Sequence, residues 1–133
     1  MIEISTDKSR LQIDVVHQFL TTSYWAKGRT LEEVKNTIKH CMCFGVYLED
    51  KQIGFARVVT DYTVFAYLMD VFILPKYQGN GYSKQLMKII NEEPKLKSCK
   101  VWMLKTSDAH KLYKKFGYSE LKHPEKVMER LLK

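Results

Sequence analysis

The sequence predicts an α/β domain of the α+β kind, with a mixed, mostly antiparallel central sheet flanked by helices. Alternating strand-like runs and helically spaced apolar residues follow one another along the chain. Two of the strand-like runs meet at Asp50 and Lys51, which predicts an antiparallel hairpin. A length of 133 residues with 45% hydrophobic content suits one core, so we expect a single domain over residues 1–133.

The first half of the chain predicts a strand, two helices and the hairpin. The residues IEIST alternate as a short strand does, and apolar residues at helical spacing predict a helix over 9–21. A second helix begins at a capping box formed by Thr30 and Glu33 and should end near His40. The hairpin follows in CFGVYLED and QIGFARVVTD.

The second half predicts alternating strands and helices. FAYLMDVFIL reads as a strand that stops at Pro75, and residues 83–91 have a helical apolar pattern. KVWMLKT predicts a further strand. SDAHKLYKKF predicts a short helix with Ser107 or Asp108 as its N-cap and Gly117 at its C-terminal end. YSELK and KVMERLL predict two last short strands.

Composition narrows the classes of function. The net charge of +7 favours an anionic ligand, such as nucleic acid, anionic lipid or a phosphorylated cofactor. Lys and Arg are scattered along the chain, so we expect neither a dedicated nucleic-acid surface nor a nucleic-acid partner. No apolar run approaches the roughly 20 residues of a membrane span, and the N-terminus does not resemble a signal peptide, which predicts a cytoplasmic protein without membrane contact.

The cysteines and histidines predict no metal site. Cys41 and Cys43 do not have the spacing of a structural zinc site, and the histidines form no paired motif. We therefore expect these two cysteines and Cys99 to be reduced, mostly buried thiols.

The stretch YQGNGYSKQL, residues 77–86, carries the clearest candidate binding motif. Gly79 and Gly81 lie between a predicted strand and a predicted helix, where free backbone N–H groups and the helix dipole attract anions. Ser83 and Lys84 do not complete a Walker loop, and the third glycine of a dinucleotide fingerprint is missing. This pattern leaves open whether the loop binds phosphate or only turns the chain.

The segment from Gln78 to Ser83 resembles the Gln/Arg-x-x-Gly-x-Gly/Ala signature of the GCN5-related N-acetyltransferases. MDVFILPKYQGNGYSKQLM is similar to the signature strand, loop and helix of that superfamily, and DAHKLYKKFGY to its last helix. The resemblance covers essentially the whole chain and points to small stand-alone members of bacterial type. It implies the acyl-CoA N-acyltransferase fold and direct transfer of an acetyl group from acetyl-CoA, in a ternary complex, to a small-molecule amine or a protein amino group.

The resemblance also implies where the cofactor binds. The strand Tyr67 to Ile73 should separate from residues 100–106, so that the pantetheine arm enters the gap between them. Ser83 stands where Gly or Ala is usual, and Thr106 where Asn often precedes the last helix. The implied cofactor residues are Val71, Phe72, Ile73, Gln78, Gly79, Asn80, Gly81, Tyr82, Ser83, Lys84, Thr106 and Tyr113.

Acetyl transfer to an amine needs an oxyanion donor, an acid for the departing thiolate and a route for the proton of the amine. A backbone N–H near Phe72 is the expected donor. Tyr113 corresponds to the usual tyrosine of the family and is the expected acid, the alternative being a packing role. Met69 occupies a position where some relatives carry a catalytic Glu, which leaves Asp70 as the nearest carboxylate.

The role of Asp70 stays open between a catalytic base, a base acting through water and a structural group. Strand alternation would turn Asp70 away from the side of Met69. Asp61 is a second candidate base. The simpler interpretation is that Asp61 is an exposed turn residue with no catalytic role.

Tyr24 and Trp25, between the first two helices, resemble the acceptor-side loop of the family, where aromatic rings face a cationic amine. Their alternative is a hydrophobic plug under the loop. Two other functions stay open: a catalytically silent acyl-CoA-binding module, because Met69 replaces the Glu, and a basic nucleic-acid binder. The oligomeric state is also open, a homodimer included.

Overall fold

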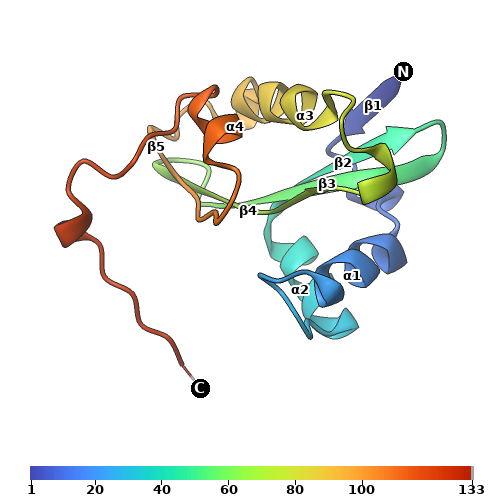
Figure 1. Cartoon of the computed structure of the whole chain (residues 1–133), viewed down its shortest axis with the longest axis horizontal. Helices are drawn as coiled ribbons and strands as arrows, with labels where there is room; N and C mark the ends of the chain where they lie inside the picture. Colours follow the sequence, from blue (N-terminus) through green and yellow to red (C-terminus); the bar gives the residue numbers. More distant parts are fainter. Residues whose placement is uncertain (133) are drawn as a thin grey trace.

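A single five-stranded sheet forms the centre of the protein in a computed structural model, which describes residues 1–132 (Figure 1). The strand order is β1-β2-β3-β4-β5, with antiparallel pairing throughout except for the parallel pair β4 and β5. This confirms the predicted mixed, mostly antiparallel sheet. The strands are β1 (Ile2–Ser5), β2 (Met42–Leu48), β3 (Lys51–Thr60), β4 (Phe65–Ile73) and β5 (Val101–Met103).

Helices cover both faces of the sheet (Figure 1). The helices α1 (Ile13–Thr22) and α2 (Leu31–His40) lie on one face, and α3 (Tyr82–Asn91) and α4 (His110–Lys114) on the other. Two hydrophobic clusters result, one containing Leu86 and Met87 of α3 and the other Val16 of α1 and Val34 of α2. None of the helices within residues 1–132 is long and apolar enough to cross a membrane.

Several local predictions are confirmed in the first half. Thr30 and Glu33 form the expected capping box, and the β2–β3 hairpin forms with its turn at Glu49 and Asp50, one residue earlier than predicted, since Lys51 already pairs with Leu48. The predicted helix over 9–21 begins later, at Ile13. The Asp7 carboxylate caps a separate short 3₁₀ turn, Lys8–Arg10, by accepting the Ser9 N–H, and the chain is then extended at Leu11.

The two strands predicted after α4 are wrong. Residues 118–132 contain one 3₁₀ turn, Pro124–Lys126, and no strand. The tail runs away from the sheet (Figure 1), with Met128 and Leu131 almost fully exposed. A strand requires a neighbour that takes up its backbone N–H and C=O groups, and the tail meets none on this path.

A β-bulge in β4 determines where Asp70 points. Met69 pairs with Arg57 and Phe72 with Phe55, so β4 has two residues where β3 has one. Asp70, one of the two, has a positive φ of 54°. The expectation that Asp70 turns away from the side of Met69 is wrong, because the bulge brings its carboxylate to Arg57, the cross-strand partner of Met69.

The sheet opens between β4 and β5. The two strands pair only from Phe65 with Val101 to Tyr67 with Met103, although β4 continues to Ile73. The remainder of β4 therefore has one edge that β5 does not cover.

Candidate active site

The glycine-rich loop between β4 and α3 borders a cavity of about 300 Å³, which we call the loop cavity. Gly79 and Gly81 both adopt left-handed backbone conformations, with φ of 86° and 79°. A Cβ at either position would meet no atom within 4 Å, so the glycines are required by backbone conformation and leave the space in front of them open. The lining residues are Ile73, Tyr77, Gln78, Gly79, Gly81, Tyr82, Ser83, Lys84 and Leu112.

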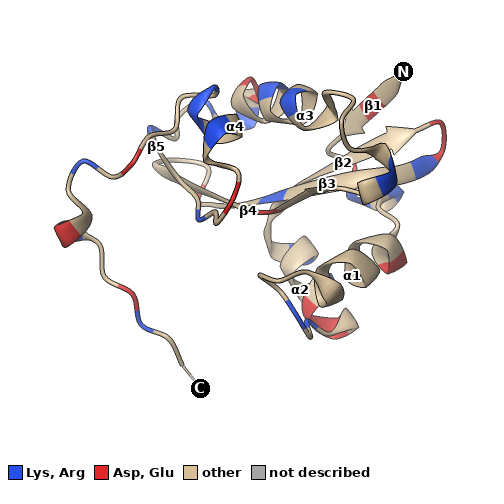
Figure 2. Cartoon of the chain, viewed as in Figure 1, with Lys and Arg blue, Asp and Glu red and all other residues tan. Residues whose placement is uncertain are grey.

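The N-terminus of α3 points unpaired N–H groups toward this loop. Gly81 is the N-cap and supplies no capping side chain, and within residues 1–132 the backbone N–H groups of 79–84 have no hydrogen-bond partner. Figure 2 shows Lys and Arg on both α3 and α4, the helices beside the loop. Open N–H groups, the helix dipole and nearby positive charge together favour an anion such as phosphate.

Two amide side chains of the motif hold the loop in shape. Gln78 donates from Nε2 to the Ile73 carbonyl at 2.9 Å, and Asn80 donates from Nδ2 to the Tyr77 carbonyl at 3.0 Å. Both amides are thus used within the loop, which ties the glycine-rich turn to the end of β4.

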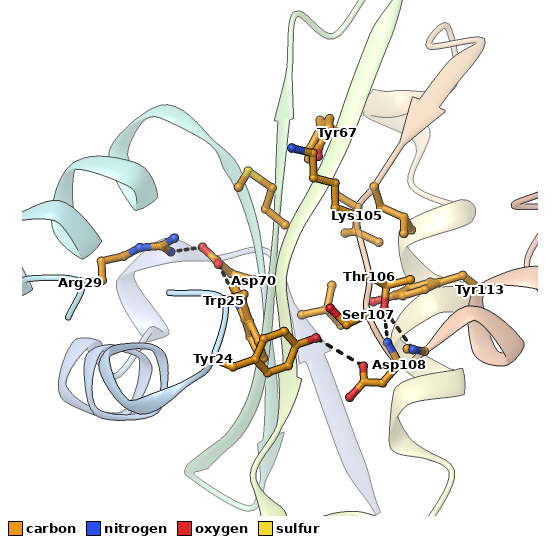
Figure 3. Close-up of a pocket in the computed structure, with 15 residues that line it drawn as sticks. Tyr24, Trp25, Arg29, Tyr67, Asp70, Lys105, Thr106, Ser107, Asp108 and Tyr113 are labelled. Carbon is orange, nitrogen blue, oxygen red and sulfur yellow. Dashed lines mark hydrogen bonds and ion pairs between the residues drawn. The ribbon is translucent and has the colours of Figure 1, made fainter. Parts of the chain in front are cut away.

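A second cavity of about 340 Å³, the gap cavity, lies where β4 and β5 separate (Figure 3). Its walls are the middle of β4, residues 104–109 after β5, Tyr113 of α4, and Tyr24, Trp25 and Arg29 from the loop between α1 and α2. β4 and α4 line both cavities, since Val71 and Tyr113 border the gap cavity and Ile73 and Leu112 the loop cavity.

Tyr113 is buried in the wall of the gap cavity. Burial raises the pKa of its phenol to about 12, and the negative charges of Asp108 and of an ionised Tyr24 add to this shift. Its ring packs edge to face on Tyr118, which is itself partly buried against the core. The phenol therefore keeps its proton at neutral and mildly alkaline pH.

The Asp70 carboxylate is fully buried and has three donors. Oδ1 accepts the Trp25 indole N–H at 2.9 Å, and Oδ2 accepts Arg57 Nε at 2.5 Å and an N–H of Arg29. Because Trp25 and Arg29 belong to the loop between α1 and α2, this carboxylate attaches that loop to the bulge of β4.

Tyr24 and Trp25 both border the gap cavity and remain 61% and 40% exposed. Tyr24 donates from its hydroxyl to Asp108 Oδ1 over a long 3.4 Å, which links the loop to the segment before α4 (Figure 3). Trp25 lies against Phe19 with ring centroids 5.9 Å apart. The structure thus brings these aromatic residues together with Tyr113 and Asp70 around one cavity.

Other residues singled out in the sequence have local structural roles. The Asp61 carboxylate accepts the backbone N–H groups of Thr63, Val64 and Phe65, which lower its pKa, and it lines neither cavity. The N-cap of α4 is Ala109, not Ser107 or Asp108. Its N–H is accepted by the Thr106 hydroxyl at 3.0 Å.

The cysteines are free and buried, as predicted. Within residues 1–132, no group of three His, Cys, Asp or Glu side chains is placed to hold a metal ion.

The sequence reasoning missed Arg29, Arg57 and the carboxylate of Asp108. Arg57 carried a usable signal, because an arginine within the apolar run GFARVV must be paired if the strand is buried. Arg29 and Asp108 lie in polar loop segments, and their partners are 41 and 84 residues distant in sequence, so no local pattern identifies them.

A mixed sheet that opens between two parallel strands, beside a helix with a free N-terminus, defines the acyl-CoA N-acyltransferase class of fold. The chain belongs to the GNAT acetyltransferase family: the family described as "Acetyltransferase (GNAT) domain" matches residues 39–120.

Similar proteins agree with this assignment. A crystal structure from Xanthomonas campestris, of a protein assigned to the GNAT family, has 42% identity and a TM-score of 0.96, covering 99% of this chain and 94% of that one. A candidate acetyltransferase of Gibberella zeae is 29% identical over 88% of this chain and 78% of its own length. A predicted acetyltransferase from Clostridium acetobutylicum, solved with acetyl-CoA, has a TM-score of 0.72 over 98% of this chain and 95% of that one; at 13% identity it supports the fold alone.

Proposed function

We propose that the protein transfers an acetyl group from acetyl-CoA to a primary amine, on a small molecule or a protein, directly and in a ternary complex. The observation that carries this proposal is that one strand, β4, borders both the anion-attracting loop cavity and the gap cavity that contains Tyr113. A cofactor with a phosphate end and a reactive end would contact both. We expect the protein to act in the cytoplasm.

The N–H groups of 79–84 would bind the pyrophosphate of the cofactor, and Lys84 would add positive charge. The pantetheine arm would run along the open edge of β4, where backbone groups of Val71 would accept and donate hydrogen bonds. Phe72 was also expected to contribute here, but it is the antiparallel partner of Phe55 and its backbone groups face β3. Of the carbonyls there, that of Ile73 is already used by Gln78. Membership of the GNAT acetyltransferase family supports the choice of cofactor.

The chemistry requires one bond to form and one to break. The nitrogen of a neutral amine attacks the thioester carbonyl, the C–S bond breaks, and the ammonium formed on the product loses its proton to water. A backbone N–H at the Asp70–Phe72 bulge would stabilise the oxyanion. Tyr113, which holds its proton because burial raises its pKa to about 12, would protonate the thiolate.

We assign Asp70 a positioning role in this reaction. Its three donors leave its carboxylate committed to Trp25, Arg29 and Arg57, so it would act by holding the acceptor-side loop against β4.

Replacing Gly81 by Val tests the cofactor site. A β-branched residue resists a φ of 79°, so the loop should shift and lose backbone contacts to the pyrophosphate. We expect the affinity for CoA, measured by titration calorimetry, to fall about 100-fold, since each charge-assisted hydrogen bond is worth roughly 1.5–3 kcal/mol.

Gly28→Val is the matched control. Gly28 has a φ of 82° and equally open space, but lies in the loop between α1 and α2. The Gly28→Val substitution should lower the stability of the protein by a similar amount and leave its affinity for CoA unchanged. A folded Gly81→Val protein that binds CoA like the parent would show that the glycine loop is only a turn.

Replacing Trp25 by Ala tests the acceptor side. Trp25 lines the gap cavity but not the loop cavity, so the KM for the acceptor should rise about tenfold with the KM for acetyl-CoA within twofold. Initial rates at varied concentrations of each substrate separate the two constants. Equal increases in both, or an unfolded variant, would favour the hydrophobic-plug role.

A catalytically silent acyl-CoA-binding module is the second candidate, favoured by Met69 where some relatives carry Glu. Release of CoA thiol from acetyl-CoA in the presence of a panel of amines distinguishes the two. Tight CoA binding without amine-dependent thiol release would establish the silent module.

A further inference from the structure

We infer that Asp108 is the acceptor-binding carboxylate, and that the gap cavity takes a cationic amine whose ammonium lies between Asp108 and the rings of Tyr24 and Trp25. This inference rests on the proposed function and specifies its substrate class. The supporting observations are the charge balance of the cavity, the hydrogen bonds of Asp108 and the placement of the aromatic rings.

Four charged side chains line the gap cavity, and three of them have a partner of opposite charge. Asp70 is bound to Arg29, and Lys105 lies 2.5 Å from Glu129. Asp108 forms no ion pair with any residue in 1–132. The cavity therefore has one carboxylate whose charge the protein itself leaves unbalanced.

The Asp108 carboxylate also has no backbone role. The sequence predicted it as a candidate N-cap of α4, but the Thr106 hydroxyl accepts the Ala109 N–H instead. Its one hydrogen bond within the described chain is the long 3.4 Å contact from the Tyr24 hydroxyl. Most of its acceptor capacity is thus available to a ligand.

The aromatic rings favour a cation at the same place. Tyr24 and Trp25 pack edge to face with centroids 5.2 Å apart, and both line the cavity (Figure 3). The Tyr24 hydroxyl reaches Asp108, so a group bound at that carboxylate lies close to the Tyr24 side chain. A carboxylate and ring faces both attract an ammonium and disfavour an anion.

The position of Asp108 relative to Tyr113 suits the reaction. Asp108 is close enough for its charge to contribute to the raised pKa of Tyr113, the proposed acid for the thiolate. An ammonium drawn to Asp108 would therefore be delivered near the group that completes the transfer, and it would lose a proton to water before attack.

A set of ligands that share one skeleton tests this inference without requiring turnover. Phenethylamine and phenethyltrimethylammonium are cationic, 2-phenylethanol is neutral and 3-phenylpropionate is anionic. Their binding to the full chain, with and without CoA, is measured by titration calorimetry. We expect the two cations to bind about tenfold more tightly than the alcohol, and the anion most weakly.

Asp108→Asn should remove the preference for the cations and keep the affinity for CoA. Asp50→Asn is the matched control: it deletes the same charge at an exposed turn that lines neither cavity, so the preference should persist. Equal affinity for phenethylamine and the alcohol in the parent, or an unchanged preference in Asp108→Asn, would overturn the inference.

Kinetics separate this inference from the proposed function. Selective cation binding without acetyl transfer to any amine would refute the transferase and leave the cation site intact. Acetyl transfer with an unchanged KM for the acceptor in Asp108→Asn would refute the role of Asp108 and leave the proposed transferase function intact. Where transfer occurs, we expect that KM to rise about tenfold in the variant, with the KM for acetyl-CoA unchanged.

Discussion

Replacing Tyr113 by Phe is expected to lower kcat by about 10²- to 10⁴-fold, the usual contribution of a general acid, with acetyl-CoA affinity nearly unchanged. The substitution keeps the ring and its packing on Tyr118, and removes the proton that the departing thiolate needs. Thiol release from acetyl-CoA, with the amine that supports the fastest turnover, measures the effect.

Tyr118→Phe is the control for Tyr113→Phe. Tyr118 packs on Tyr113 and its hydroxyl is buried without a hydrogen-bond partner within residues 1–132, but it does not line the gap cavity. Its removal should leave kcat within a few-fold of the parent. If Tyr113→Phe is equally harmless, water protonates the thiolate and Tyr113 only packs.

The pH profile gives a second check on Tyr113. An acid is active while it is protonated, and burial raises the pKa of this phenol to about 12. The parent enzyme should therefore show no loss of kcat from this group between pH 8 and 10.5, where an unshifted phenol would begin to ionise. A Tyr113-dependent decrease centred near pH 10, absent in the Phe variant, would contradict the buried, protonated state.

Replacing Asp70 by Asn is expected to lower the free energy of unfolding by about 3–5 kcal/mol, because it leaves buried guanidinium charge without its partner. Arg57 is only 6% exposed, and the Asp70 side chain is inaccessible to solvent. The attachment of Trp25 and Arg29 to β4 should weaken as well. Urea denaturation followed by circular dichroism measures the change.

Glu3→Gln provides the comparison for Asp70→Asn, since it also deprives an arginine of its carboxylate. The Glu3 and Arg10 side chains are 65% and 32% exposed, so water replaces the lost interaction and the effect should be far smaller. Similar destabilisation in both variants would show that the buried ion pairs of Asp70 stabilise the protein no more than an exposed ion pair does.

Asp70→Asn also separates a positioning role from catalysis. Loss of a general base would abolish the decrease of kcat/KM on the acid side, whereas loss of a positioning group would raise the acceptor KM and leave that limb in place. We expect the second result. The disappearance of the acid limb in a folded variant would identify Asp70 as the base.

The elements that the sequence predicted well depend on neighbours along the chain. The capping box at Thr30 and Glu33 is confirmed because its two residues are three positions apart, and the β2–β3 hairpin is confirmed because its pairing starts at a short turn, with Leu48 opposite Lys51. The terminal strands failed because pairing needs a distant edge, which no local pattern supplies. KVMERLL is apolar enough for a strand, but its apolar residues Met128 and Leu131 stay exposed.

By itself, the sequence determined the main helices and strands, their order and the glycine loop, since periodicity and capping follow from short-range geometry. The tertiary structure decided the surroundings of the charged groups. The bulge at Asp70 replaced simple alternation and turned a candidate base into the partner of Arg57 and Arg29. The tertiary structure also left Asp108 without an oppositely charged partner within the described chain. Both outcomes depend on residues 13 to 84 positions apart, which only the folded backbone brings within hydrogen-bonding distance.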